Sequence, residues 1–164
     1  MKPTALCAAG IAAATIVAAC GDDTEPLMKE EFIEQADAIC AETNERVAPI
    51  FEAVWADIDD AEETSGASGP LVFVRFDRAV DEAMPHFAQQ LSELRGLEPP
   101  AEDEELVTGL LDDHESALAR GAELAEAAAG GDEAAIATLD NDDPIDEVER
   151  RVRAYGMRVC GGDG

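Results

Sequence analysis

The chain has 164 residues with four cysteines and seven aromatic side chains, and its 38 acidic and 11 basic residues give a formal net charge of −27. This length fits one modest domain and excludes a multidomain assembly on a single chain. The acidic excess excludes a nucleic-acid-binding protein, because neutralising phosphates requires a basic face.

A lipoprotein signal peptide is expected over residues 1–19. Lys2 precedes an apolar run from Ala5 to Ala19, which as a helix would span about 22 Å, less than the roughly 30 Å of a bilayer's hydrocarbon core. The sequence Val17-Ala18-Ala19-Cys20 resembles the bacterial lipobox, whose cysteine is diacylated and becomes the new N-terminus after cleavage. An ordinary secretory signal with an unrelated cysteine is the alternative.

We therefore expect Cys20 to anchor the protein through its lipid to a bacterial membrane, outside the cytoplasm. Each buried acyl methylene contributes about 0.8 kcal/mol, so several chains hold a protein on a bilayer stably. Residues 20–26 form a polar tether, and residues 27–160 are expected to form the folded domain. Which membrane carries the anchor stays open, because Gly21 rather than an aspartate follows the cysteine.

Apolar residues then recur at steps of three or four, the spacing of a buried helical face. The first such stretch runs from Leu27 to Ile58, and Pro49 inside it is expected to kink or divide the helix. The acidic residues from Asp57 onward oppose the negative end of the helix dipole, so this end is expected to fray. A second helix is expected to begin at Pro70 and to end before Gly96, with Pro85 as an interruption.

The third helix is expected over residues 101–129, and small residues such as Ala117 and Gly121 on its inward side are expected to let a neighbouring helix approach closely. A short helical piece over residues 132–139 follows, and a last helix begins at Pro144 and ends before Gly156. Four main helices joined by short connections predict an all-α fold, an antiparallel four-helix up-down bundle. In that topology the last helix ends near the first, which brings Cys160 toward Cys40.

Cys40 and Cys160 are the two thiols that remain after Cys7 leaves with the signal peptide and Cys20 is acylated. In an oxidising compartment an even number of remaining cysteines predicts a disulfide. Closing this loop of 120 residues would stabilise the fold by at most about 5 kcal/mol. A metal-thiolate pair and a redox-active pair are alternatives, but there is no Cys-x-x-Cys, and only two histidines could complete a zinc site.

Two segments carry a resemblance to known proteins. FIEQADAIC at residues 32–40 and YGMRVCG at residues 155–161 resemble the terminal segments of a group of uncharacterised bacterial secreted proteins and lipoproteins. These are small, alanine-rich helical proteins with one cysteine near each end. The resemblance implies a Cys40–Cys160 pair and an all-helical fold, and it implies no activity.

Residues that could perform chemistry are sparse. The histidines are His86 and His114, and the residues three before them are Ala83 and Leu111, so neither belongs to the Glu-x-x-His motif of di-iron bundles. A haem held by a methionine and a histidine remains an alternative. No serine lies in a Gly-x-Ser-x-Gly elbow. We expect no catalytic residues, no metal site and no cofactor.

The acidic run Asp140-Asn141-Asp142-Asp143, together with Asp146 and Glu147, is the strongest candidate for a Ca²⁺ site, because hard cations prefer oxygen ligands. Its spacing does not match an EF-hand loop, since the glycine and the closing glutamate of that loop would fall at Ile145 and Arg151. A solvated turn with a helix N-cap is the favoured interpretation.

Six of the seven aromatic residues lie in the first two expected helices, and the hydrophobic core of the bundle is their first interpretation. The functional interpretation is an apolar groove that holds a lipid or a small hydrophobe. Its candidate residues are Phe51, Trp55, Phe73, Phe76 and Phe87.

Cleavage before Cys20 removes one basic residue, Lys2, and leaves ten basic against 38 acidic residues, a net charge of −28. A salt-adapted source and a cationic protein partner both fit this charge. The sequence favours a non-catalytic, lipid-anchored binding or interaction module. A carrier of a small hydrophobe or a cation is the first alternative, and an enzyme of unrecognised class is the second.

Overall fold

The computed structural model describes residues 26–65, 71–141 and 144–162, and the side chains of residues 57–65 and 140 are outside that description. The regular elements in these ranges are helices, which confirms the all-α class: α1 (Lys29–Ser65), α2 (Leu71–Arg95), α3 (Glu104–Ala129), α4 (Glu133–Asn141) and α5 (Pro144–Tyr155). None of these helices combines the length and the apolar character needed to cross a membrane. The expected signal peptide, Cys20 and nearly all of the tether lie outside the described residues.

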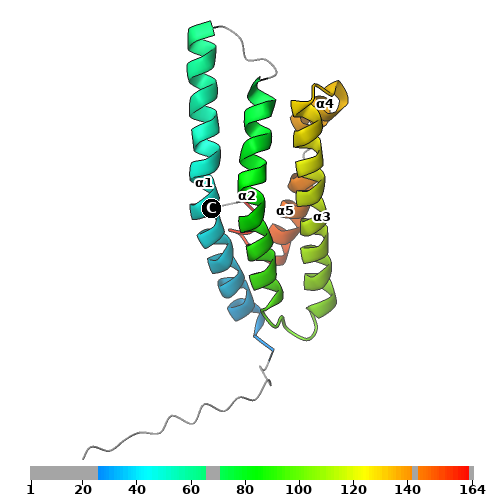
Figure 1. Ribbon diagram of the computed structural model, residues 1–164. Helices are drawn as coiled ribbons and strands as arrows, with labels where there is room; N and C mark the ends of the chain where they lie inside the picture. Colours follow the sequence, from blue (N-terminus) through cyan, green and yellow to red (C-terminus); the bar gives the residue numbers. More distant parts are fainter. Residues whose placement is uncertain (1–25, 66–70, 142–143, 163–164) are drawn as a thin grey trace, which may run out of the picture.

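The helices form a bundle in which α2 lies between α1 and α3 (Figure 1). Both α4 and α5 pack on α3, with α4 at the upper end of the view. The short helix α4 is the piece expected around residues 132–139. Asp132 begins it by accepting hydrogen bonds from the backbone N–H groups of Ala134 (2.8 Å) and Ala135 (3.2 Å), an N-cap arrangement.

The internal prolines do not divide their helices. Residue Pro49 lies inside α1, and Pro85 lies inside α2. A proline removes one backbone hydrogen bond, but packing against neighbours provides most of a helix's stability in a folded domain. Buried Thr43 and Val47 before Pro49 supply such packing in α1. The first helix also remains helical to Ser65, beyond the expected end at Ile58 and through the acidic run that was expected to fray.

The main hydrophobic core lies where α1, α2, α3 and α5 meet, and Phe32, Ala36 and Leu110 are among its most buried side chains. The rings of Phe32 and Tyr155 meet edge to face with centroids 6.2 Å apart. A second, smaller cluster joins the end of α3 to α4.

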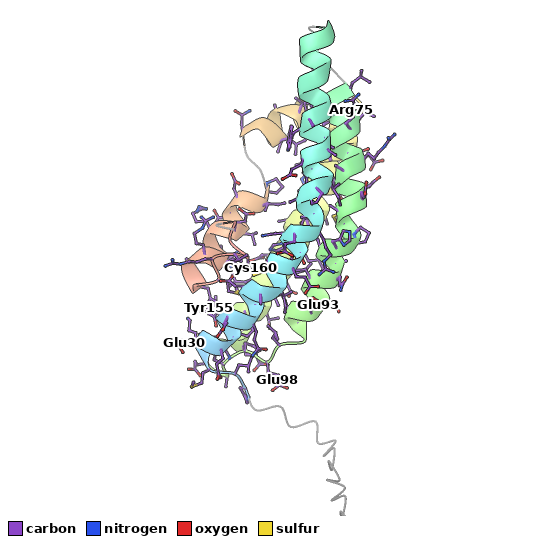
Figure 2. The ribbon with its side chains drawn as sticks, turned by 90° about the vertical axis from the view of Figure 1, so that its left-hand side faces the viewer. Glu30, Arg75, Glu93, Glu98, Tyr155 and Cys160 are labelled. Carbon is purple, nitrogen blue, oxygen red and sulfur yellow. A yellow bond between two sulfur atoms is a disulfide. The ribbon has the colours of Figure 1, made fainter. Side chains whose placement is uncertain are left out.

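Residues 156–162, the C-terminal segment, run from the end of α5 to α1. Gly156 has a φ of 125°, which favours glycine, and a Cβ there would lie 2.8 Å from Ile33 Cδ1. Cys160 forms a disulfide with Cys40, with Cα atoms 5.1 Å apart, and this confirms the expected pairing. Figure 2 shows Cys160 beside the lower half of α1, with Tyr155 nearer the lower end of that helix.

The carboxylate of Asp37 holds the same segment by its backbone. It accepts hydrogen bonds from the N–H groups of Arg158 (3.1 Å), Val159 (2.9 Å) and Cys160 (3.2 Å). Asp37 precedes Cys40 by one helical turn, so one short stretch of α1 provides both the covalent and the polar attachment. The cysteine count and the resemblance both indicated the disulfide, whereas sequence reasoning missed the role of Asp37.

Candidate ligand-binding cavity

An apolar cavity of about 300 Å³ lies among the helices. Half of its ten lining residues come from α1 and α2: Phe51, Phe76, Val80, Met84 and Phe87. The other half come from α3, α4 and α5: Leu118, Gly121, Ala122, Leu139 and Ile145. Every one of these residues is apolar or glycine, so the cavity offers van der Waals contact to an apolar ligand.

The local sequence explains why space remains here. The α2 residues at 76, 80, 84 and 87 are separated by three or four positions, so they share one face of that helix. Opposite them α3 presents Gly121 and Ala122, which do not fill the volume. A Cβ added at Gly121 would meet no atom within 4 Å.

The prediction that a neighbouring helix closely approaches Gly121 is therefore wrong. The rings of Phe51 and Phe76 lie on the other side of the cavity, with centroids 6.1 Å apart. We attribute the remaining space to these rings, because their bulk keeps the helices apart at a level where α3 has only small side chains.

The structure brings three of the five candidate groove residues together, since Phe51, Phe76 and Phe87 all line the cavity. Phe73 instead packs against the smaller cluster of α3 and α4. Trp55 lies beside the lining, with its ring centroid 6.4 Å from that of Phe76, and it remains 51% exposed. The core interpretation holds for the sixth aromatic residue, Phe32, which is 1% exposed.

A second cavity, of about 100 Å³, adjoins the apolar one and has a mixed lining of polar and apolar side chains. The two share Phe87, Leu118 and Ile145. Asn44, Gln90, His114 and Glu149 supply the polar groups of the smaller cavity, and Cys160 of the disulfide also lines it. Burial lowers the pKa of His114, because desolvation disfavours the imidazolium form, and its side chain is therefore neutral at pH 7.

Sequence reasoning missed the contributions of α4 and α5 to the apolar cavity, namely Leu139 and Ile145. Periodicity identified Ile145 as an apolar position of the last helix, but it does not report which helix faces a position meets. It also missed the polar group around Gln90, whose side chain is buried at 5% exposure. The available signal in the sequence is that Gln90 lies among the apolar positions of α2. The adjacent exposed glutamine, Gln89, makes this signal hard to recognise.

The acidic run that was the candidate Ca²⁺ site lies largely outside the described residues, as Asp142 and Asp143 and the side chain of Asp140 do. Asn141 donates its side-chain amide to the carbonyl oxygen of Ala137 at 2.7 Å. Across the described residues, no three histidine, cysteine, aspartate or glutamate side chains gather in a way that could hold a metal ion.

Comparison with known proteins found no match to this chain among protein families, curated proteins or solved structures.

Proposed function

We propose that this chain is a lipid-anchored, extracytoplasmic binding module that holds a small hydrophobic ligand in the apolar cavity. The cavity itself is the observation that carries this proposal, since its ten lining residues provide only apolar contact. Binding sites for small molecules have volumes of about 300–1,000 Å³ and mostly apolar linings. With no titratable or nucleophilic side chain among the lining residues of this cavity, binding is the chemistry that they support.

The volume limits the ligand. An apolar cavity of about 150 Å³ accommodates benzene, so twice that volume suits roughly a dozen non-hydrogen atoms. This is much smaller than a whole membrane lipid. An apolar ligand of this size is expected to bind with a dissociation constant between about 1 μM and 1 mM.

The anchor remains part of the proposal. Nine peptide units separate Cys20 from Lys29 at the start of α1, so a fully extended tether reaches about 30 Å. The acidic surface repels anionic headgroups, which favours a domain that stands away from the bilayer. The Cys40–Cys160 disulfide supports an oxidising compartment, because such bonds persist outside the cytoplasm.

We also infer that α1, α2, α3 and α5 have the up-down-up-down order of an antiparallel bundle. The short connection from Gly96 to Asp103 between α2 and α3 supports this order. The opposite colour gradients of neighbouring long helices in Figure 1 support it as well. In this order the C-terminal segment returns to α1, where Cys160 reaches Cys40.

Fluorescence of the single tryptophan tests the proposed function. Trp55 contacts Phe76 of the cavity lining, so we expect titration with n-propylbenzene to change its emission in a saturable way. Gly121→Leu should fill the cavity and abolish the response while raising the melting temperature, because leucine favours a helix over glycine by up to about 1 kcal/mol.

Gly109→Leu is the matched control, since Gly109 lies on the same helix and a Cβ there also meets nothing within 4 Å. It should raise stability and leave binding intact. Absence of a saturable response in the unmodified protein, or a response that survives Gly121→Leu, would contradict the proposal.

A protein partner is the second candidate, and exposed apolar residues on α2 favour it. Leu71 is 65% exposed and Val74, one turn later, is 42% exposed. A photocrosslinker at Val74 in the native membrane should then form a discrete adduct. The same crosslinker at Leu106, an exposed apolar residue of α3, should form none, and equal labelling from both positions would argue against this candidate.

A further inference from the structure

The two adjoining cavities differ in chemistry in a way that suggests the class of ligand. The larger has an apolar lining, whereas the smaller adds two amides, an imidazole and a carboxylate to apolar side chains. Phe87, Leu118 and Ile145 line both cavities, so the space with polar groups lies directly beside the apolar one.

Gln90 is the most buried of the four polar side chains that line the smaller cavity. Its side chain is 5% exposed and lines the smaller cavity. Within the described residues its amide has no hydrogen-bond partner, unlike the adjacent Gln89, which donates to Glu93 at 2.7 Å and accepts from Arg46 at 3.3 Å. The carboxamide of this buried residue therefore remains available to a ligand that donates to its oxygen and accepts from its nitrogen.

We propose that the ligand is a small amphiphile with an uncharged, hydrogen-bonding head group, bound with its tail in the apolar cavity and its head beside Gln90. This inference rests on the proposed function and adds the chemical class of the ligand. A hydroxyl or amide head can both donate to and accept from the carboxamide of Gln90. Asn44 and His114 line the same space and can complete the set of hydrogen bonds.

The surroundings argue against a charged head. An anionic head would meet the carboxylate of Glu149 inside a chain whose net charge is already −27. A cationic head would need a free carboxylate, but Glu149 already interacts with another group of the protein. An uncharged head avoids both conflicts and the cost of burying an ion.

Three probes with one hydrocarbon skeleton test the inference on the full disulfide-bonded protein: n-propylbenzene, phenylpropanol and phenylpropanoate. Phenylpropanol should bind at least about tenfold more tightly than n-propylbenzene, a difference of about 1.4 kcal/mol. Phenylpropanoate should bind no more tightly than n-propylbenzene. Competition against the Trp55 signal or calorimetry measures each dissociation constant.

Gln90→Leu should remove the preference for the alcohol while n-propylbenzene still binds, because leucine keeps the volume and removes the amide. Gln89→Leu is the matched control, since Gln89 is exposed on the same helix and lines neither cavity. It should leave the preference unchanged.

The outcomes separate the two proposals. If the alcohol and the hydrocarbon bind equally to the unmodified protein, the amphiphile inference is wrong while the hydrophobic cavity stands. If the preference for the alcohol survives Gln90→Leu, the proposed placement of the head beside Gln90 is wrong. If phenylpropanoate binds most tightly of the three probes, the proposed uncharged head is wrong. If n-propylbenzene does not bind at all, the proposed function fails, and the inference fails with it.

Discussion

Asp37→Ala tests how the C-terminal segment is held on α1. Asp37 accepts three backbone hydrogen bonds from residues 158–160, at distances between 2.9 and 3.2 Å. A hydrogen bond to a charged group contributes about 1.5–3 kcal/mol. The full sum is not expected, because Arg158 is exposed and its N–H can bond to water once the carboxylate is removed. We therefore expect Asp37→Ala to lower the free energy of unfolding by about 2–4 kcal/mol.

Urea denaturation at fixed ionic strength measures this loss, and the midpoint should fall with little change in the slope m. The matched control is Glu34→Ala, because Glu34 is an exposed acid on the same helix, and its removal relieves general charge repulsion by the same unit. The disulfide remains intact in both variants, so the comparison isolates the polar attachment. Asp37→Asn should fall between the two, because its neutral amide oxygen accepts weaker hydrogen bonds.

Hydrogen exchange provides a local measurement of the same effect. The amides of Val159 and Cys160 should lose protection in Asp37→Ala and keep it in Glu34→Ala, because the carboxylate is their acceptor. If the two variants differ by less than about 0.5 kcal/mol, which is the usual range of a neutral surface substitution, the polar attachment described here does not stabilise the fold.

Three further predictions concern the whole domain. Cys40→Ala with Cys160→Ala should lower the free energy of unfolding by at most about 5 kcal/mol in urea, because the disulfide closes a loop of 120 residues in the unfolded chain; a loss below about 1 kcal/mol would contradict the loop-closure argument. Because burial lowers the pKa of His114, the unfolded chain binds more protons than the folded one as the pH falls below about 6.5, and His114 should destabilise the fold progressively there. His114→Gln should reduce this acid sensitivity in pH-dependent melts, and an unchanged acid sensitivity would refute the assignment. The melting temperature should rise between 0.01 M and 1 M salt, since the Debye length shrinks from about 30 Å to about 3 Å and self-repulsion weakens, whereas an unchanged value would show that the net charge does not limit stability.

Much of the helical architecture follows from local patterns that are visible in the sequence. The spacing of Phe73, Phe76, Val80 and later apolar residues predicts the helix α2. The Asp-Pro pair at residues 143–144 and the glycine at residue 156 predict where α5 begins and ends. Both prolines lie inside continuous helices, because their local cost is offset by tertiary packing along the rest of each helix. The pairing of Cys40 with Cys160 could be predicted because a count of two left one internal partner for each thiol.

The candidate site was predictable only in part. The aromatic residues of the first two helices indicated an apolar site, and Phe51, Phe76 and Phe87 do line one. The chain gave no reason to separate these from Phe73, which faces a different neighbour, or to add Leu139 from α4. A helical pattern reports which face of a helix is buried, and it does not report the partner of that face or how well the two surfaces fill the space between them.

Apart from the end of α1, the approximate helix positions and the closing disulfide could be read from the sequence. Capping residues, apolar period and cysteine count are properties of the chain read one segment at a time. The contact of Asp37 with residues 158–160 and the open space beside Gly121 became visible in the three-dimensional arrangement alone. Both outcomes depend on distances between segments that are remote in the chain. Those distances are set by the combined packing of all the helices, which no local pattern contains.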